Sequence, residues 1–136
     1  MVDFSRVAFW ISVVLGVYVV IFHIGAFVLE SFLLDTAVGE QLLGGKPDAL
    51  AIKLGVNQGV YNLVLAGQMV AALALHADSK LRLTVHVSVF VVGLAGGITV
   101  SGTIAAIQMT PGLLGAIATA LEMLLKRRAQ AEPERL

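Results

Sequence analysis

The sequence predicts an all-α membrane protein built as a bundle of four transmembrane helices with short connections. Two observations lead to this prediction. Hydrophobic residues make up 58% of the 136 residues and charged residues only 13%, whereas soluble domains are typically about 45–50% apolar and about 25% charged. The apolar residues also form long runs separated by short charged segments, and about 20 such residues cross the hydrocarbon core of a bilayer as a helix.

The chain contains four runs of about this length. We predict transmembrane spans at residues 7–34, 54–75, 83–100 and 104–125, which together make one domain over residues 1–125. Residues 83–121 carry no Asp, Glu, Lys or Arg and are too long for a single crossing, so we place a turn at Ser101-Gly102-Thr103. The first run exceeds the roughly 7–15 apolar residues of a signal peptide and is expected to be retained. Residues 126–136 are polar and are predicted to form a frayed tail.

The basic residues predict how the bundle is oriented. Seven of the nine, at the N-terminus, in the short turn before the third span and in the tail, fall on one side of the membrane, whereas Lys46 and Lys53 fall on the other. Lys and Arg concentrate in the cytoplasmic loops of membrane proteins. We therefore expect both termini to lie in the cytoplasm.

Two features of the later spans concern packing. Gly93 and Gly97 form a small-xxx-small pair, which lets another helix backbone approach closely. Glu122 lies four residues before Lys126, a spacing that allows an ion pair on one helix face. We expect His86 to be a packed or interfacial residue.

Polar side chains form a stripe on each of the first two spans. At about 100° per residue, an arc of roughly 40° on the first span holds Ser12, Gly16, His23 and Glu30. An arc of about 140° on the second span holds Asn57, Gln58, Tyr61, Asn62 and Gln68. Because the bilayer core offers no water to satisfy such groups, we expect both stripes to face protein and the opposite face of the second span to meet lipid.

The predicted topology places several of these polar residues at one depth. The outer ends of the first, second and fourth spans meet there. We predict a polar pocket in the outer leaflet, lined by His23, Glu30, Asn57, Gln58, Tyr61, Asn62 and Gln108. Glu30 is its acid, and His23 is its group that titrates near neutral pH. The two lie about 10 Å apart along the helix, too far to touch directly.

Several chemistries are excluded. The chain has no Cys, and one His and one carboxylate beside amides are too few ligands for zinc or copper, so we expect no metal and no other cofactor. His23 and His86 fall in opposite halves of the bilayer, which argues against a bis-His haem. No nucleophile elbow, phosphate loop or carboxylate pair is present, so no catalytic residue is predicted. The net charge of zero gives no indication of a nucleic-acid partner.

The second span also contains a specific motif. Asn57-Gln58-Gly59-Val60-Tyr61-Asn62, followed by Leu65-Ala66-Gly67, resembles the signature of a small bacterial membrane family, domain of unknown function 1304. Further matches are His23 with Glu30 seven residues later, a Gly-rich third span ending in Thr99-x-Ser101, and Gln108-x-x-Pro111. The resemblance covers residues 15–125. It implies a four-span protein of the bacterial inner membrane and little about function.

Three functions stay open. In the first, the polar pocket binds or transports a small polar ligand, an ion or a lipid headgroup. In the second, the polar residues only hold the helices together, and the protein is a structural or accessory subunit of a larger membrane complex. In the third, the protein is an enzyme on a lipid-type substrate, with Glu30 and His23 as acid and base. The bilayer is the expected partner, and the sequence leaves a homo-oligomer open.

Overall fold

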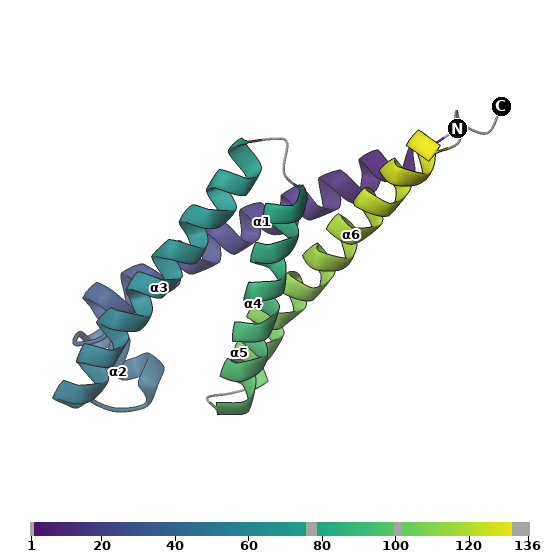
Figure 1. Cartoon of the computed structure of the whole chain (residues 1–136). Coiled ribbons are helices and arrows are strands. Elements are labelled where there is room, and N and C mark those ends of the chain that lie inside the picture. Colours follow the sequence, from purple (N-terminus) through teal and green to yellow (C-terminus); the bar gives the residue numbers. More distant parts are fainter. Residues whose placement is uncertain (1, 76–78, 100–101, 132–136) are drawn as a thin grey trace. The chain divides into compact units, whose positions relative to one another are not determined.

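The computed structural model of the chain is helical (Figure 1). It describes residues 2–75, 79–99 and 102–131, and no strand occurs in these ranges, which confirms the predicted all-α class. Two of the elements, η1 and η2, are single π-helical turns. The elements in order are α1 (Phe4–Val28), η1 (Leu29–Leu33), α2 (Ala37–Leu43), α3 (Ala49–Ala74), α4 (Ser79–Thr99), α5 (Gly102–Ile104), η2 (Ala105–Met109) and α6 (Thr110–Ala131).

Among the described residues, three helical segments are long and apolar enough to cross a membrane. They are Phe4–Leu33, Ser79–Thr99 and Ala106–Ala131, with mean hydropathies of 2.4, 1.7 and 1.3. These segments give the chain the character of a membrane protein. The remaining long helix, α3, has 26 residues, but its side-chain amides, among them Asn57, Gln58 and Gln68, lower its hydropathy. The structure therefore shows three candidate spans where the sequence predicts four.

The helix ends differ in places from the predicted boundaries. Helix α1 begins at Phe4 because Asp3 Oδ1 accepts hydrogen bonds from the backbone N–H groups of Ser5 (3.0 Å) and Arg6 (3.3 Å). The hydrogen bond from the Ser5 hydroxyl is the main reason why the pKa of Asp3 lies below its ordinary value. Helix α6 continues to Ala131, past the predicted end of the last span at Leu125. Ser101, in the predicted turn, lies outside the described residues, and Gly102 and Thr103 begin α5.

The loop predicted at residues 35–53 contains a short helix, α2, that the sequence analysis missed. The helix ends where Gly44 adopts a left-handed backbone (φ 72°) and the N–H of Gly45 donates to Glu40 O at 2.9 Å. Asp48 Oδ1 then accepts the N–H of Ala51 at 2.7 Å and so starts α3. Residues 44–48 thus form the turn that their Gly, Pro and Asp residues predict.

The chain divides into two compact units, which are described separately. The terminal unit combines Met1–Val19 with Met69–Leu136, and the central unit is Val20–Gln68. In the terminal unit, α4 packs along η2 and α6 (Figure 1). A Cβ atom on Gly93 would lie 2.8 Å from the Cα of Met109, and one on Gly112 would lie 2.9 Å from the Cα of Phe90. The helices therefore touch backbone to backbone, which confirms the packing role predicted for Gly93.

In the central unit, α3 approaches the first helix and η1 through a second pair of small residues. A Cβ on Gly55 would lie 3.1 Å from Glu30 O, and one on Gly59 would lie 3.3 Å from Phe27 O and collide with Ser31 Oγ. Gly55 and Gly59 are four residues apart and form the small-xxx-small pattern that permits such contact. This pair was not predicted from the sequence, where the pattern was noted at Gly93 and Gly97.

We expect Gly59→Val to destabilise the protein by about 1–3 kcal/mol, the usual effect of overpacking a tight contact. Gly67→Val is the matched control, because Gly67 is in the same helix and nothing lies within 4 Å of its Cβ position. Unfolding in detergent micelles, followed by circular dichroism, measures both variants. Equal losses of stability would show that the backbone contact at Gly59 does not matter.

Candidate functional site

Glu30 and Asn62 form the centre of the candidate site in the central unit. Asn62 Nδ2 donates a hydrogen bond of 2.7 Å to Glu30 Oε2. Asn62 is only 4% exposed, and Glu30 is partly buried. The bond joins two residues that the sequence analysis placed in one pocket from two separate spans. Glu30 Oε1 makes no hydrogen bond to the described part of the chain.

Glu30 lies in the π-helical turn η1, over Leu29–Leu33. π-helical turns are rare in proteins overall, and those that occur often lie at functional sites. Its neighbour Ser31 is in the same turn, and the Ser31 hydroxyl oxygen is buried without a hydrogen-bond partner in the structure. The turn thus combines a carboxylate with an unused oxygen and a hydroxyl that could donate or accept. Both groups can still form hydrogen bonds.

The other predicted residues of the central unit lie differently. His23 is fully buried, and its ring meets that of Phe22 edge to face at 5.3 Å between centroids. Asn57, Gln58 and Tyr61 are exposed. Within the central unit, Asn62 is the residue of this polar stripe that reaches the first helix, and what the other stripe residues face stays a prediction. The reason is geometric, since Gly55 and Gly59 turn the opposite side of α3 toward the first helix and only Asn62, at the edge of the stripe, lies near that side.

Gln108 belongs to the terminal unit and lies in the second π-helical turn, η2, where it is 7% exposed. The Tyr18 hydroxyl donates to the carbonyl oxygen of Ile107 in the same turn, at 2.9 Å. Glu30 and Gln108 thus each occupy a π-helical turn of their own unit. The assignment of Gln108 to a common pocket stays a prediction from the sequence.

A second polar cluster, which the sequence analysis did not predict, lies in the terminal unit. Glu122 on α6 forms an ion pair with Arg82 on α4, and the two residues are 1% and 2% exposed. Lys126 Nζ lies 2.7 Å from Glu122 Oε1, which confirms the predicted ion pair at that spacing. The Arg82 guanidinium also lies 5.0 Å from the centre of the Phe9 ring. Arg82 had been assigned to a charged turn, whereas α4 begins three residues earlier, at Ser79.

Hydrogen bonds join the same two helices, α4 and α6, to α1. The Thr119 hydroxyl donates to Gly115 O at 2.8 Å, so the Ser12 hydroxyl donates to Thr119 Oγ1, at 2.6 Å. His86 Nε2 lies 3.3 Å from Ser12 O, and its ring fills the space that a side chain on Gly115 would occupy. His86 is fully buried, as expected for a packed histidine. Its Nδ1 atom and the Nε atom of Arg82 are buried without hydrogen-bond partners.

The two carboxylates have different surroundings. Glu122 is paired with two cations, whereas no cation pairs with Glu30 in the described part of the chain. No group of three or more His, Cys, Asp or Glu side chains that could hold a metal ion occurs among the described residues. Glu122 therefore has the surroundings of a structural ion pair. Glu30 is a carboxylate that can still accept a further hydrogen bond or pair with a cation.

We expect Glu122→Gln to destabilise the protein by about 3–5 kcal/mol, because it leaves the buried Arg82 without its counter-charge. Lys126→Gln should cost about 1 kcal/mol or less, since the Lys126 side chain is 55% exposed. Unfolding in detergent micelles measures both. The double variant Arg82→Met, Glu122→Met should recover much of the loss, because it removes both charges together. A double variant as unstable as Glu122→Gln would contradict the ion-pair explanation.

Comparison with known proteins adds one match. The family model DUF1304, described as a protein of unknown function, matches residues 17–120. No curated protein and no solved structure matches the chain. The matched range contains all seven predicted pocket residues and the Glu30–Asn62 hydrogen bond, whereas Glu122 lies just beyond it.

Proposed function

The chain belongs to the DUF1304 family of proteins of unknown function, and we propose that it is an integral membrane protein that binds a small polar ligand, an ion or a lipid headgroup at Glu30 and Asn62. The observation that carries this proposal is the hydrogen bond between these two side chains. It uses one carboxylate oxygen and leaves the other available. An ionisable residue within a span is costly, and such residues usually mark functional sites.

The absence of a counter-charge at Glu30 favours a cationic ligand group. In the described part of the chain, the only hydrogen bond that the carboxylate accepts comes from an amide, and an amide does not neutralise it. A ligand that carries an ammonium group or is a metal cation would supply the missing charge. The buried hydroxyl of Ser31 offers one further contact in the same turn. The sequence assigns His23, Asn57, Gln58, Tyr61 and Gln108 to the same site, and their part in binding stays a prediction.

The proposed topology has four spans with both termini in the cytoplasm of a bacterial cell and the chain in its inner membrane. Helix α3 is the fourth span. Its 26 residues extend about 39 Å at 1.5 Å per residue, more than the roughly 30 Å of the hydrocarbon core. Its polar residues Asn57, Gln58 and Tyr61 lie in the first half, toward the proposed outer surface, and Asn62 lies at the middle. The imbalance of Lys and Arg between the two sides supports this orientation.

One observation favours a second candidate function, that of an accessory subunit in a larger membrane complex. Asn57, Gln58 and Tyr61 are exposed on α3, and Tyr61 is 59% exposed. Polar side chains at membrane depth need hydrogen-bond partners. A partner helix with its own polar side chains would provide them.

Alkaline phosphatase fusions test the topology, because this reporter is active only outside the cytoplasm. We expect a fusion after Gly45 to be active and fusions after Leu75 and Leu136 to be inactive. Two active fusions at Gly45 and Leu75 would mean that α3 does not cross the membrane. An active fusion after Leu136 would reverse the proposed position of the C-terminus.

Thermal unfolding with added cations tests the site. Ethanolamine hydrochloride, magnesium chloride and sodium chloride serve as probes at matched ionic strength. We expect at least one to raise the Tm of the wild-type protein, since a ligand at 100 times its Kd stabilises the folded state by about 2.7 kcal/mol. Glu30→Gln should abolish the rise, whereas Glu40→Gln, the same change in the neighbouring helix α2, should keep it.

Two outcomes would count against the ligand site. A Tm rise that survives Glu30→Gln would place the binding elsewhere. A second outcome is that no probe raises the Tm of the wild-type protein, while Asn62→Ala lowers the Tm strongly. It would mean that the Glu30–Asn62 hydrogen bond only holds the helices together. Purification with a stoichiometric partner protein would then favour the accessory function.

A further inference from the structure

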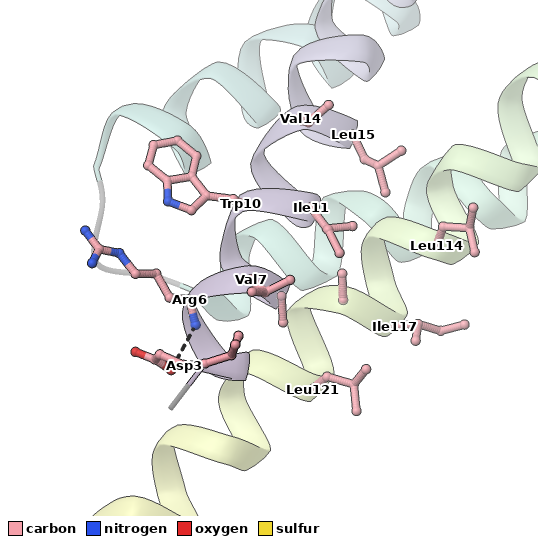
Figure 2. A pocket seen from close by; sticks show the side chains of 13 residues that line it. Asp3, Arg6, Val7, Trp10, Ile11, Val14, Leu15, Leu114, Ile117 and Leu121 are labelled. Atoms are coloured by element: carbon pink, nitrogen blue, oxygen red, sulfur yellow. Dashed lines mark hydrogen bonds between the residues drawn. The ribbon is translucent and has the colours of Figure 1, made fainter.

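An apolar groove runs between α1 and α6 in the terminal unit (Figure 2). Its volume is about 1050 Å³, at the upper end of the roughly 300–1,000 Å³ of small-molecule pockets. Six aliphatic side chains that line it are Val7, Ile11 and Leu15 of α1 and Leu114, Ile117 and Leu121 of α6. A groove of this size and lining can hold an acyl chain.

Small residues make the space for the groove. Ala8 of α1 and Ala118 of α6 both line it and are 7% and 5% exposed, so they lie at its base. The 2.6 Å hydrogen bond between Ser12 and Thr119 holds the same two helices at a fixed separation. The groove therefore results from the packing of α1 against α6.

One end of the groove is charged. Asp3 and Arg6 line it where α1 begins, and Trp10 follows one turn later (Figure 2). On α6, Arg128 lies seven residues after Leu121 and so continues the stripe that lines the groove. Asp3 already accepts the N–H groups that start α1. Arg6 and Arg128 are both exposed, so their side chains can reach an anion at this end of the helix pair.

We propose that the groove binds one anionic phospholipid, with an acyl chain along the aliphatic lining and the phosphate at Arg6 and Arg128. Lipid tails are as apolar as the groove, so apolar contact alone gives little selectivity within a bilayer. The guanidinium groups supply it, because their planar arrangement of donors matches phosphate oxygens. Trp10 lies four residues after Arg6, one helical turn away, and tryptophan is enriched at membrane interfaces. No groove residue belongs to the Glu30–Asn62 site, so this proposal is independent of the proposed function.

Trp10 is the only tryptophan of the chain and lines the groove, so its fluorescence reports on the bound lipid. The purified full-length protein is placed in phosphatidylcholine vesicles that contain a small fraction of brominated phosphatidylglycerol or of brominated phosphatidylcholine. Bromine quenches tryptophan on contact. Since a basic side chain near a membrane contributes roughly fivefold in affinity for anionic lipid, we expect phosphatidylglycerol to quench several-fold more at equal mole fraction.

Two variants distinguish lipid binding in the groove from a general attraction of anionic lipid to the basic residues. Arg6→Gln should lower the preference for phosphatidylglycerol about fivefold. Arg127→Gln is the matched control, because Arg127 lies beside Arg128 but off the groove stripe, and it should keep the preference. Circular dichroism checks that both variants are folded.

Three outcomes would overturn the proposal. Equal quenching by the two lipids would mean that the groove meets only bulk lipid. An equal loss in the Arg6 and Arg127 variants would mean a diffuse electrostatic effect. Absence of quenching by either lipid, together with a dimer in detergent, would mean that a second copy of the chain covers the groove.

Discussion

The structure depends on one constraint, which is that a carboxylate inside an apolar helical protein must be compensated by its surroundings. The described residues include two such carboxylates, one in each unit. Glu122 is fully buried and is compensated by Arg82 and Lys126. Glu30 is only partly buried and accepts one hydrogen bond, from Asn62. The degree of burial follows the degree of compensation, as the cost of an uncompensated buried charge requires.

Close backbone contact makes this compensation geometrically possible. Short polar side chains reach across only where the helix axes lie near each other, and glycines bring them there. Gly59 lies three residues before Asn62, on the face of α3 that approaches Phe27 and Ser31. Gly115 gives space to the ring of His86, which reaches Ser12 O. The glycines and the polar contacts are therefore two parts of one arrangement.

The sequence predicts the helical class from its composition. The polar stripe of the first span predicts that Ser12 and His23 face protein, and both are buried. The Glu30–Asn62 contact was also within reach of this reasoning, as a pairing of two polar stripes. The face of α3 that meets the first helix could not be predicted in this way. Side-chain polarity suggested one inward face, whereas the Gly55–Gly59 pair determines another. Arg82 was assigned to the charged turn before the third span, because basic residues next to a span usually mark its cytoplasmic end. Its ion pair with Glu122 becomes visible only when α4 packs against α6.

The π-helical turns could not be predicted from the sequence either, since no residue type specifies them. In the described part of the chain, each unit has one such turn, and each turn contains a polar residue of the predicted pocket. A π turn contains one residue more than an α turn and loosens the regular backbone hydrogen bonding around it. Glu30 and Gln108 both occupy such turns, whereas the ion pair Arg82–Glu122 lies in regular α-helix. Both turns also lie at close backbone contacts, Met109 at Gly93 and the Glu30 carbonyl at Gly55, so the same irregular segments pack the helices. Because π turns are frequent at functional sites, the turn at Glu30 supports the proposed ligand site beside the unused carboxylate oxygen.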